Sequence, residues 1–332
     1  MIWSISLNLR SISVFMKKVK IIIICLGLIM DIYAQSFDAK SVFNSGATFG
    51  VEYLFPSSIN DSTDFQMTKY KIEFVKVLRT KEVDLNQFDM KKDDAKANQL
   101  FLKSKFSLSK PSLSNDNYFR NQLKAELELI YITASKKRGV WFHGANVNAE
   151  ENNKTFPAEL SPNFRAYSVY IHAKNLDFIP FIGPSFSITQ GNLFLLPIFG
   201  VRAKLKGNLF AELIAPIHFK LKYNYKNKID YELAIAYSGI HTVYRESTYL
   251  NDNDSENLQQ LKTHLGINTR LYKYYKFKVE LGYAFLQEID PVSYDNSQKM
   301  SSMPFINFSF NYNFGNSILY KFFNEEKPKK VK

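Results

Sequence analysis

The sequence of 332 residues predicts an all-β fold, an antiparallel transmembrane β-barrel, on three observations. Segment after segment alternates apolar and polar residues with a period of two, as the two faces of a β-strand do. No stretch beyond the first 35 residues approaches the roughly 18 uninterrupted apolar residues of a membrane helix. The chain is nevertheless rich in aromatic residues, with 29 Phe and 20 Tyr, and a barrel turns every second side chain of its strands toward lipid.

The N-terminal segment has the three-part layout of a secretory signal peptide. The apolar run Ile21–Met30 is followed by a short polar exit ending at Ala34, and it is preceded by Lys17, Lys18 and Lys20. The alternative, a membrane-anchor helix, needs about 20 apolar residues, and this run has half that number. We therefore predict a signal peptide over residues 1–34, with Met16 as an alternative translation start, and a barrel over residues 35–314.

The cysteine content and the net charge limit the kinds of bond and binding partner expected for this chain. Cys25 is the only cysteine and lies inside the predicted signal, so the exported chain would have no disulfide and no thiolate metal site. The formal net charge of +12 favours anionic lipid headgroups or lipopolysaccharide phosphates over nucleic acid, which an exported chain rarely meets. A lysine-rich proteome is an equal explanation. The basic tail 315–332 is expected to lie in periplasmic solvent.

The alternation recurs along the whole chain. In Ile306–Phe314 every second residue is Ile, Phe or Tyr, and Asn or Ser stands between them. The other clear segments are Gln122–Thr133, Ile217–Tyr225 and Lys276–Leu286. Weaker versions occur in Gly46–Phe55, Phe65–Leu78, Gln99–Ser109, Tyr167–Ala173, Phe178–Ile188, Gly200–Leu205, Leu209–Ile214, Tyr231–Tyr237 and Leu258–Tyr272. These segments predict about 12 strands, with about 10 to 14 as the range, because single-chain bacterial barrels have even strand numbers.

The connections alternate imperfectly between tight and long, as do short periplasmic turns and longer external loops. The tight ones are Ser135–Gly139, Asn175–Asp177, Lys206–Asn208 and Lys226–Lys228, and the long ones are Ala145–Pro162, Tyr249–Asn257 and Glu288–Ser301. Lys81–Lys96 breaks the alternation, so it either hides a strand or folds separately.

Two of the tight turns predict a strand register. If Lys226–Lys228 is a three-residue turn, Lys222 lies opposite Glu232 and Tyr223 opposite Tyr231. If Lys206–Asn208 is another, Arg202 lies opposite Glu212. Both registers bring opposite charges together on the polar face, which contributes about 0.2–1 kcal/mol for each pair.

A soluble β-sandwich or a large soluble barrel also alternates, but it turns its apolar face inward. Large aromatic faces on most strands, opposite strongly charged faces, favour a membrane barrel with its polar face toward the lumen. We predict that the lumen is lined by Arg202, Glu212, His218, Lys220, Lys222, Glu232, Lys278 and Glu280. Mixed charge can fill a narrow lumen with ion pairs or line a water-filled one, and the sequence leaves both open.

The segment Phe194–Arg245 resembles a Bacteroidota family of predicted outer-membrane barrels of unknown function. The residues that carry the resemblance are Pro197, the run from Gly200 to Arg202, the strand ending at Pro216, and the tyrosines after it. The resemblance covers mainly the C-terminal half and implies the outer membrane of a Gram-negative bacterium, with no activity attached. The aromatic strand Ile306–Phe314 also resembles the last-strand insertion signal of outer-membrane proteins, although residues 315–332 follow it.

No motif in the chain points to catalysis. None of the five histidines stands in a G-x-S-x-G or H-E-x-x-H motif. Residues 251–256 lack the glycine and the terminal glutamate spacing of a calcium loop. We therefore predict a protein that is not an enzyme and has no cofactor and no metal site.

The first functional hypothesis is passage or transport of a small solute across the outer membrane by a monomeric barrel. The second is a plugged structural or interaction barrel. The third, an outer-membrane hydrolase, requires a serine or an acid within hydrogen-bond reach of a histidine at the lumen mouth. The expected partners are outer-membrane lipid and lipopolysaccharide, the barrel-assembly machinery during insertion, and no nucleic acid.

Overall fold

The computed structural model describes thirteen ranges, which are residues 44–60, 63–81, 96–114, 121–135, 139–151, 162–172, 177–189, 192–215, 218–226, 228–243, 255–272, 274–290 and 298–316. Every helix or strand within these ranges is a β-strand, and no helix there is long and apolar enough to cross a membrane. The predicted signal peptide, the tail from residue 317 onward and the middle of Lys81–Lys96 lie outside the described residues.

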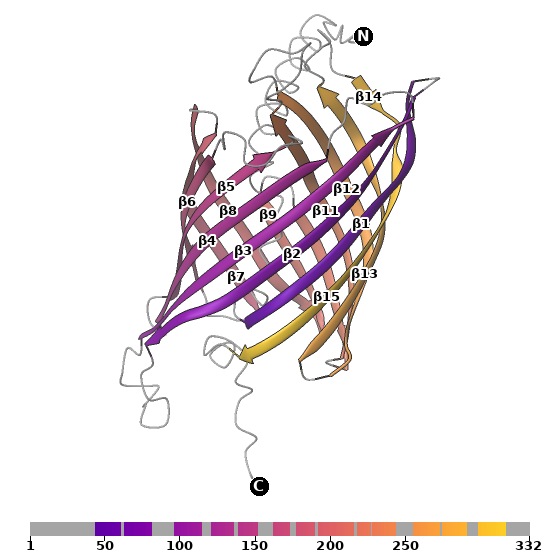
Figure 1. Cartoon of the computed structure of the whole chain (residues 1–332). Coiled ribbons are helices and arrows are strands. Elements are labelled where there is room, and N and C mark those ends of the chain that lie inside the picture. Colours follow the sequence, from indigo (N-terminus) through magenta and orange to yellow (C-terminus); the bar gives the residue numbers. More distant parts are fainter. Residues whose placement is uncertain are drawn as a thin grey trace, which may run out of the picture.

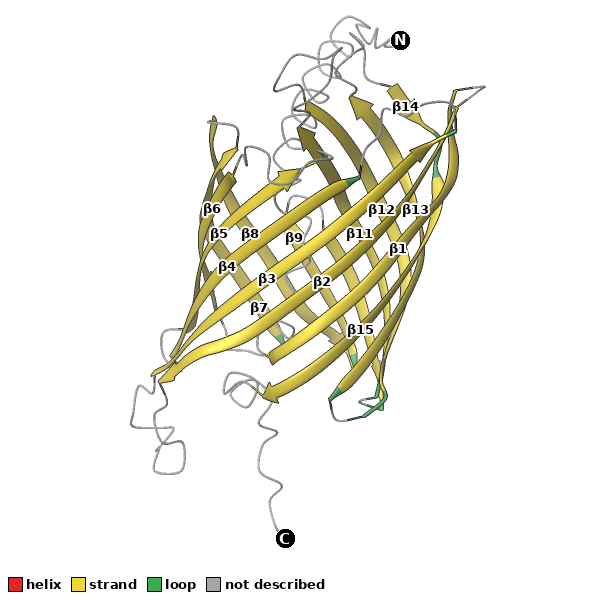
Figure 2. Cartoon of the chain, in the orientation of Figure 1, coloured by secondary structure: helices red, strands yellow, loops and turns green. Residues whose placement is uncertain are grey.

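The strands form one antiparallel sheet that closes on itself (Figures 1 and 2). In chain order they are β1 (Asn44–Asn60), β2 (Thr63–Lys81), β3 (Lys96–Leu113), β4 (Gln122–Ser135), β5 (Gly139–Glu151), β6 (Pro162–Ile171), β7 (Phe178–Thr189), β8 (Asn192–Lys206), β9 (Leu209–Ala215), β10 (His218–Tyr225), β11 (Ile229–Val243), β12 (Ser255–Arg270), β13 (Tyr275–Asp290), β14 (Gln298–Met300) and β15 (Met303–Asn316). Each strand from β1 to β13 pairs with the next strand in the chain, β13 also pairs with β15, and β15 pairs with β1 to close the ring.

The wall has 14 strands. The three-residue β14 is not counted separately, because it and β15 pair with successive parts of the same strand, β13. The predicted all-β antiparallel barrel is therefore confirmed, with a strand number at the upper limit of the predicted range. An even number of strands brings the start of β1 and the end of β15 to the same end of the barrel. We call this end, which also carries the short connections after β4, β8 and β10, the turn end (lower in Figure 1) and the other the loop end.

Most of the difference from the predicted strands lies in β5 and β8. The sequence analysis assigned Ala145–Pro162 to a long polar loop, but β5 extends to Glu151 and β6 begins at Pro162. Asn146 and Asn148 suggested a loop because their polar side chains point into the barrel, where both are buried. Strand β8 begins eight residues before the predicted Gly200, because apolar residues on both of its faces hide the alternation.

Two predicted long loops are also partly strand. Strand β12 starts at Ser255, inside the predicted loop Tyr249–Asn257. Strand β13 continues to Asp290, and β14 lies within the predicted loop Glu288–Ser301. Polar residues continue past the point where apolar alternation fades, so the pattern underestimates strand length at the loop end.

The predicted register is confirmed at both hairpins. Lys222 pairs with Glu232 and Tyr223 with Tyr231, and Arg202 pairs with Glu212. The turn between β8 and β9 has only two residues, and an irregularity between Lys204 and Lys206 restores the register. Gly207 in this turn has φ 57°, a backbone conformation that glycine adopts without steric cost.

The outer surface of the wall is apolar. Exposed Leu, Ile, Val and Phe side chains occur on strand after strand, among them Phe106, Leu127, Ile182, Leu265 and Leu281. Charged side chains on most of the strands point inward, and several of them are buried. A closed antiparallel wall with lipid-compatible side chains outside and charged side chains inside is the architecture of an outer-membrane β-barrel.

Candidate functional site

Strand β2 crosses three different layers of the barrel interior. From the loop end to the turn end, its inward side chains are Phe65, Met67, Lys69, Lys71, Glu73, Val75 and Val77. The row thus begins apolar, becomes charged and ends apolar. The lumen as a whole contains two apolar clusters, one toward each end, and a belt of charged side chains.

The two apolar clusters lie at opposite ends and on different arcs of the wall. The loop-end cluster comprises Leu54, Phe65, Met67, Ala284, Met300, Met303 and Phe305. The turn-end cluster spans β2 to β9 and comprises Val75, Phe101, Ile130, Ile132, Ala134, Val140, Phe142, Val169, Ile171, Phe181 and Ile214. All of these side chains are nearly or fully buried, so packed apolar side chains fill part of the interior at each end.

The charged belt consists of inward ionic side chains that pair with one another. Between β3 and β4, Lys103 Nζ lies 3.4 Å from Glu128 Oε2, and Lys105 Nζ lies 3.7 Å from Glu126 Oε2. Lys262 of β12 reaches Glu52 of β1 at 2.6 Å, although two strands of the wall, β13 and β15, separate them. Pairing across such a span shows that belt side chains meet in the interior and do not merely line it.

A tyrosine anchors the belt to β5 and β6. The Tyr167 hydroxyl donates a hydrogen bond to Glu128 Oε1 at 2.9 Å. Its ring lies over Gly144 on the neighbouring strand, where a Cβ atom would be 2.2 Å from the ring carbon Cζ. Gly144 therefore provides the space in which the tyrosine ring lies flat and presents its hydroxyl to the carboxylate.

All eight predicted lumen residues lie on the inward face, but Lys222 and Arg202 contact other residues than the glutamates expected from the register. His218, Lys220, Glu232 and Glu280 are buried. Lys222 pairs with Asp230 at 2.9 Å and not with Glu232, its neighbour in the register. The Arg202 guanidinium lies 5.0 Å from the centroid of the Phe210 ring, and His218 Nε2 lies 4.0 Å from Glu212 Oε1.

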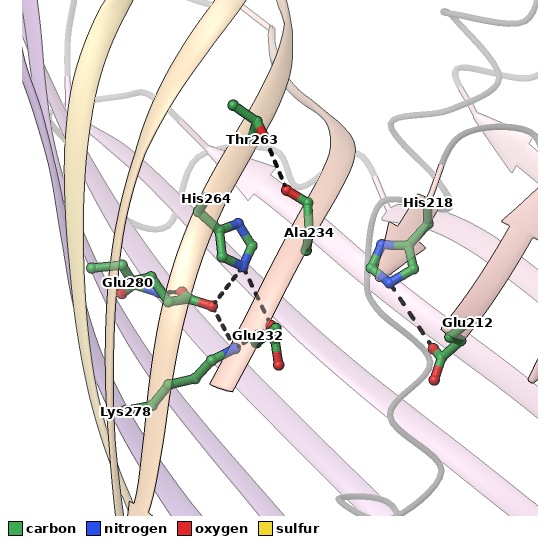
Figure 3. A network of polar contacts seen from close by, with 9 residues as sticks. Glu212, His218, Glu232, Ala234, Thr263, His264, Lys278 and Glu280 are labelled. Atoms are coloured by element: carbon green, nitrogen blue, oxygen red, sulfur yellow. Dashed lines mark hydrogen bonds and ion pairs between the residues drawn. The ribbon is translucent and has the colours of Figure 1, made fainter. Parts of the chain in front are cut away.

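Glu232 and Glu280 both contact His264, which the sequence analysis did not select, and both also pair with Lys278 (Figure 3). His264 Nε2 lies 3.3 Å from Glu232 Oε1 and 3.1 Å from Glu280 Oε1. Lys278 Nζ lies 3.0 Å from the same Glu232 oxygen and also pairs with Glu280 Oε1. We call these four residues the Glu–His–Glu–Lys cluster.

Small residues at alternate positions make this convergence possible. Across β11, β12 and β13, Gly266 stands in the register between Glu232 and Glu280. One pair of positions nearer the loop end, His264 stands between Ala234 and Gly282. A Cβ atom on Gly282 would lie 2.1 Å from the Thr263 carbonyl oxygen, so only glycine fits beside the histidine. Large and small side chains thus alternate over a two-by-three patch of the wall.

The described histidines also bear on the hydrolase hypothesis. Ser168 Oγ lies 3.0 Å from Nδ1 of His143, but both residues are on the outward face of β5 and β6. Trp141 stacks against the His143 ring with an interplanar angle of 2°. His264 has two acids in reach, yet it lies in the belt and not at the lumen mouth. Neither histidine provides the lumen-mouth arrangement that the hydrolase hypothesis requires.

No family model matches the chain, and the search of curated proteins gave no match. Among solved structures it is similar to an outer membrane channel from Pseudomonas putida F1, with 11% identity, coverage of 82% of this chain and 98% of that chain, and a TM-score of 0.35. It is also similar to outer membrane phospholipase A from Escherichia coli, with 11% identity, coverage of 84% and 95%, and a TM-score of 0.34.

The translocator domain of the autotransporter NalP from Neisseria meningitidis is a third similar structure, with 10% identity, coverage of 91% of this chain and 99% of that chain, and a TM-score of 0.32. At these identities and TM-scores, none of the three assigns a role to this chain. The resemblance to a Bacteroidota family stays a prediction.

Proposed function

We propose that the protein is an outer-membrane barrel with a closed lumen, and that it has a structural or interaction role. The observation that carries this proposal is the burial of paired charges inside the wall. Glu232 and Glu280 are each 7% exposed and Lys262 is 9% exposed. A water-filled lumen would leave such side chains solvated on their inner side, whereas these are largely shielded from solvent.

The pairing also explains why the belt resists opening. Removing one partner from a buried ion pair leaves the other charge uncompensated, at a cost of about 3–5 kcal/mol. In the Glu–His–Glu–Lys cluster each carboxylate pairs with both His264 and Lys278. Solute passage would have to separate several such groups at once. A barrel of 14 strands lies between small filled barrels and open porins of about 16–18 strands, so closure depends on these side chains.

Passage of a small polar solute is the second candidate, and one strip of the wall favours it. The inward face of β15 toward the turn end carries Ser309, Asn311 and Asn313 and no charge. Asn311 Nδ2 donates to Thr48 Oγ1 of β1 at 2.7 Å. A narrow path along β1 and β15 would meet only neutral polar groups on this strip.

The proposed setting is the outer membrane of a Gram-negative bacterium, with insertion by the barrel-assembly machinery and a monomeric final state. The apolar outer surface supports lipid as the surrounding partner. Lipopolysaccharide phosphates are a second proposed contact, supported by the outward Lys110 near the loop end, whose Nζ lies 5.6 Å from the Tyr70 ring centroid. A closed sheet has no free edge for strand addition, which supports the monomer.

Planar-bilayer conductance of refolded residues 35–332 over a range of salt concentrations tests the closed lumen. We expect no steady channels from a preparation whose folding is verified by faster migration of the unboiled barrel on a gel. A variant with serine at Lys103, Lys105, Glu126 and Glu128 removes two ion pairs of the belt and serves as the opened control. Steady, salt-dependent channels from the unmodified protein would overturn the closed lumen in favour of passage.

A further inference from the structure

The Glu–His–Glu–Lys cluster contains three side chains with the geometry of a metal site. His264 Nε2 and one oxygen each of Glu232 and Glu280 all lie within 4.8 Å of one another. The two distances from Nε2 to these oxygens are 3.3 Å and 3.1 Å. Ligands of tetrahedral zinc, at about 2.0–2.2 Å from the ion, are about 3.3 Å apart. The spacing from the histidine to both carboxylates therefore already matches that of a coordinated ion.

We propose that Glu232, His264 and Glu280 bind a divalent transition-metal ion, with Zn²⁺ as the representative ion. One imidazole and two carboxylates are a ligand set that suits zinc, whereas Mg²⁺ and Ca²⁺ prefer oxygen ligands alone. The ion would take the place of the hydrogen that Nε2 shares with the two carboxylates. The sequence predicted no metal site, and this proposal does not depend on whether the lumen is closed.

The wall around these ligands is built to hold them in place. Gly266 leaves the space between Glu232 and Glu280 open, because a Cβ atom there would be only in ordinary contact, 3.5 Å from each of those side chains. Asn307 Nδ2 donates a hydrogen bond to Glu280 Oε2, which orients that carboxylate and leaves Oε1 toward the histidine. Hydrogen bonds from outside the ligand set fix ligand orientation in this way at metal sites.

Lys278 contacts the same carboxylates that would bind the metal ion. Its ammonium group contacts Oε1 of both Glu232 and Glu280, the same two oxygens that face the histidine. The Lys278 side chain is 26% exposed, against 6% and 10% for the two glutamates and 14% for His264, so it is the most exposed member of the cluster. Lysine and metal therefore compete for the two carboxylates, and Lys278 lowers the affinity for the ion.

Titration calorimetry with zinc chloride on the untagged, chelator-treated, refolded barrel tests the site. We expect one Zn²⁺ per barrel, bound at least about tenfold more weakly by His264→Gln and by Glu232→Gln, as for loss of a group that holds the ion. Lys278→Met should bind at least about tenfold more tightly, because the competing cation is gone. Lys222→Met is the matched control, since its partner is Asp230 and not a proposed ligand, and its affinity should equal that of the unmodified protein.

Three results would overturn the proposal. These are an absence of zinc binding in both the unmodified barrel and Lys278→Met, an equal affinity in His264→Gln, and an equal affinity in Lys278→Met. Migration of the unboiled barrel on a gel shows that each variant is folded, so a failed variant is not mistaken for a lost site. Visible absorption of bound Co²⁺ gives a second readout of four-coordinate geometry. Bilayer conductance reports separately on the closed lumen, so the two proposals can fail independently.

Discussion

Tyr167 combines packing and hydrogen bonding in one side chain. Its ring covers Gly144 and its hydroxyl donates to the buried Glu128. Tyr167→Phe keeps the ring and removes only the hydrogen bond, leaving a buried carboxylate with one partner fewer. We expect the free energy of unfolding to fall by about 1–3 kcal/mol, as measured by urea titration of the refolded barrel. Tyr170→Phe is the control, since that hydroxyl meets the neighbouring His172 on the outward face. Equal losses in the two variants would show that the Glu128 contact contributes nothing special.

At the scale of elements, β6 and β7 approach each other very closely at one point. Their pairing skips Ser168 and Val169, which stand opposite Pro184 and Gly183 respectively, and proline has no N–H to donate. A Cβ atom on Gly183 would lie 1.8 Å from the Ser168 carbonyl oxygen and 2.7 Å from the Val169 Cα. These are backbone atoms, so neither can move aside without shifting the strand.

Gly183→Ala should therefore separate β6 from β7. We expect a loss of at least about 1–3 kcal/mol, the usual cost of overpacking, or no folded band on a gel. Gly50→Ala on β1 is the control, because its nearest atom would be 3.6 Å away, and we expect it to fold with nearly unchanged stability. A Gly183→Ala barrel as stable as Gly50→Ala would show that the strands can move apart at no cost.

For the whole molecule, the inside-out arrangement makes a prediction that separates a membrane barrel from a soluble one. Leu265 is 66% exposed on the outer face of β12. In water, Leu265→Arg would change stability by no more than about 0.5 kcal/mol. In a bilayer the same change near the midplane should cost about 2–4 kcal/mol, measured by unfolding the barrel in liposomes. Leu205→Arg, beside the turn at Gly207, is the control and should cost about 0–1 kcal/mol. Equal, negligible costs would contradict a lipid-facing outer surface.

The alternation of apolar and polar residues was sufficient to predict the fold class and the inward face. It worked best where one face is uniformly aromatic, as in Ile306–Phe314, because lipid outside and polar groups inside impose a strict period of two. It failed in β5, where inward Asn146 and Asn148 resemble a loop, and in β8, where both faces are apolar. Inward apolar clusters break the pattern, and composition alone gives no sign of them.

The partners of the inward charges could not be predicted in the same way. The register placed Lys222 opposite Glu232 correctly, yet Lys222 pairs with Asp230 and Glu232 pairs with Lys278. Which carboxylate each lysine pairs with depends on the side chains of three adjacent strands and on the space that Gly266 leaves between Glu232 and Glu280. His264 was missed because it stands in a weakly alternating segment, with no local motif. An alignment of β12 with β11 and β13 could have found it, because it places His264 and Gly266 beside Glu232 and Glu280.

Because Asn44 pairs with Asn316, the first and last strands are neighbours, and the wall could in principle begin at any strand. Paired Cα atoms in an antiparallel ladder are about 4.5–5.5 Å apart, so a linker of a few residues could join the start of β1 to the end of β15. A circularly permuted chain, joined there and opened between β11 and β12, would keep every strand neighbour of the wall. It would, however, make the β12–β13 hairpin the first to leave the ribosome, and so would reveal whether assembly follows strand order or only the final set of neighbours.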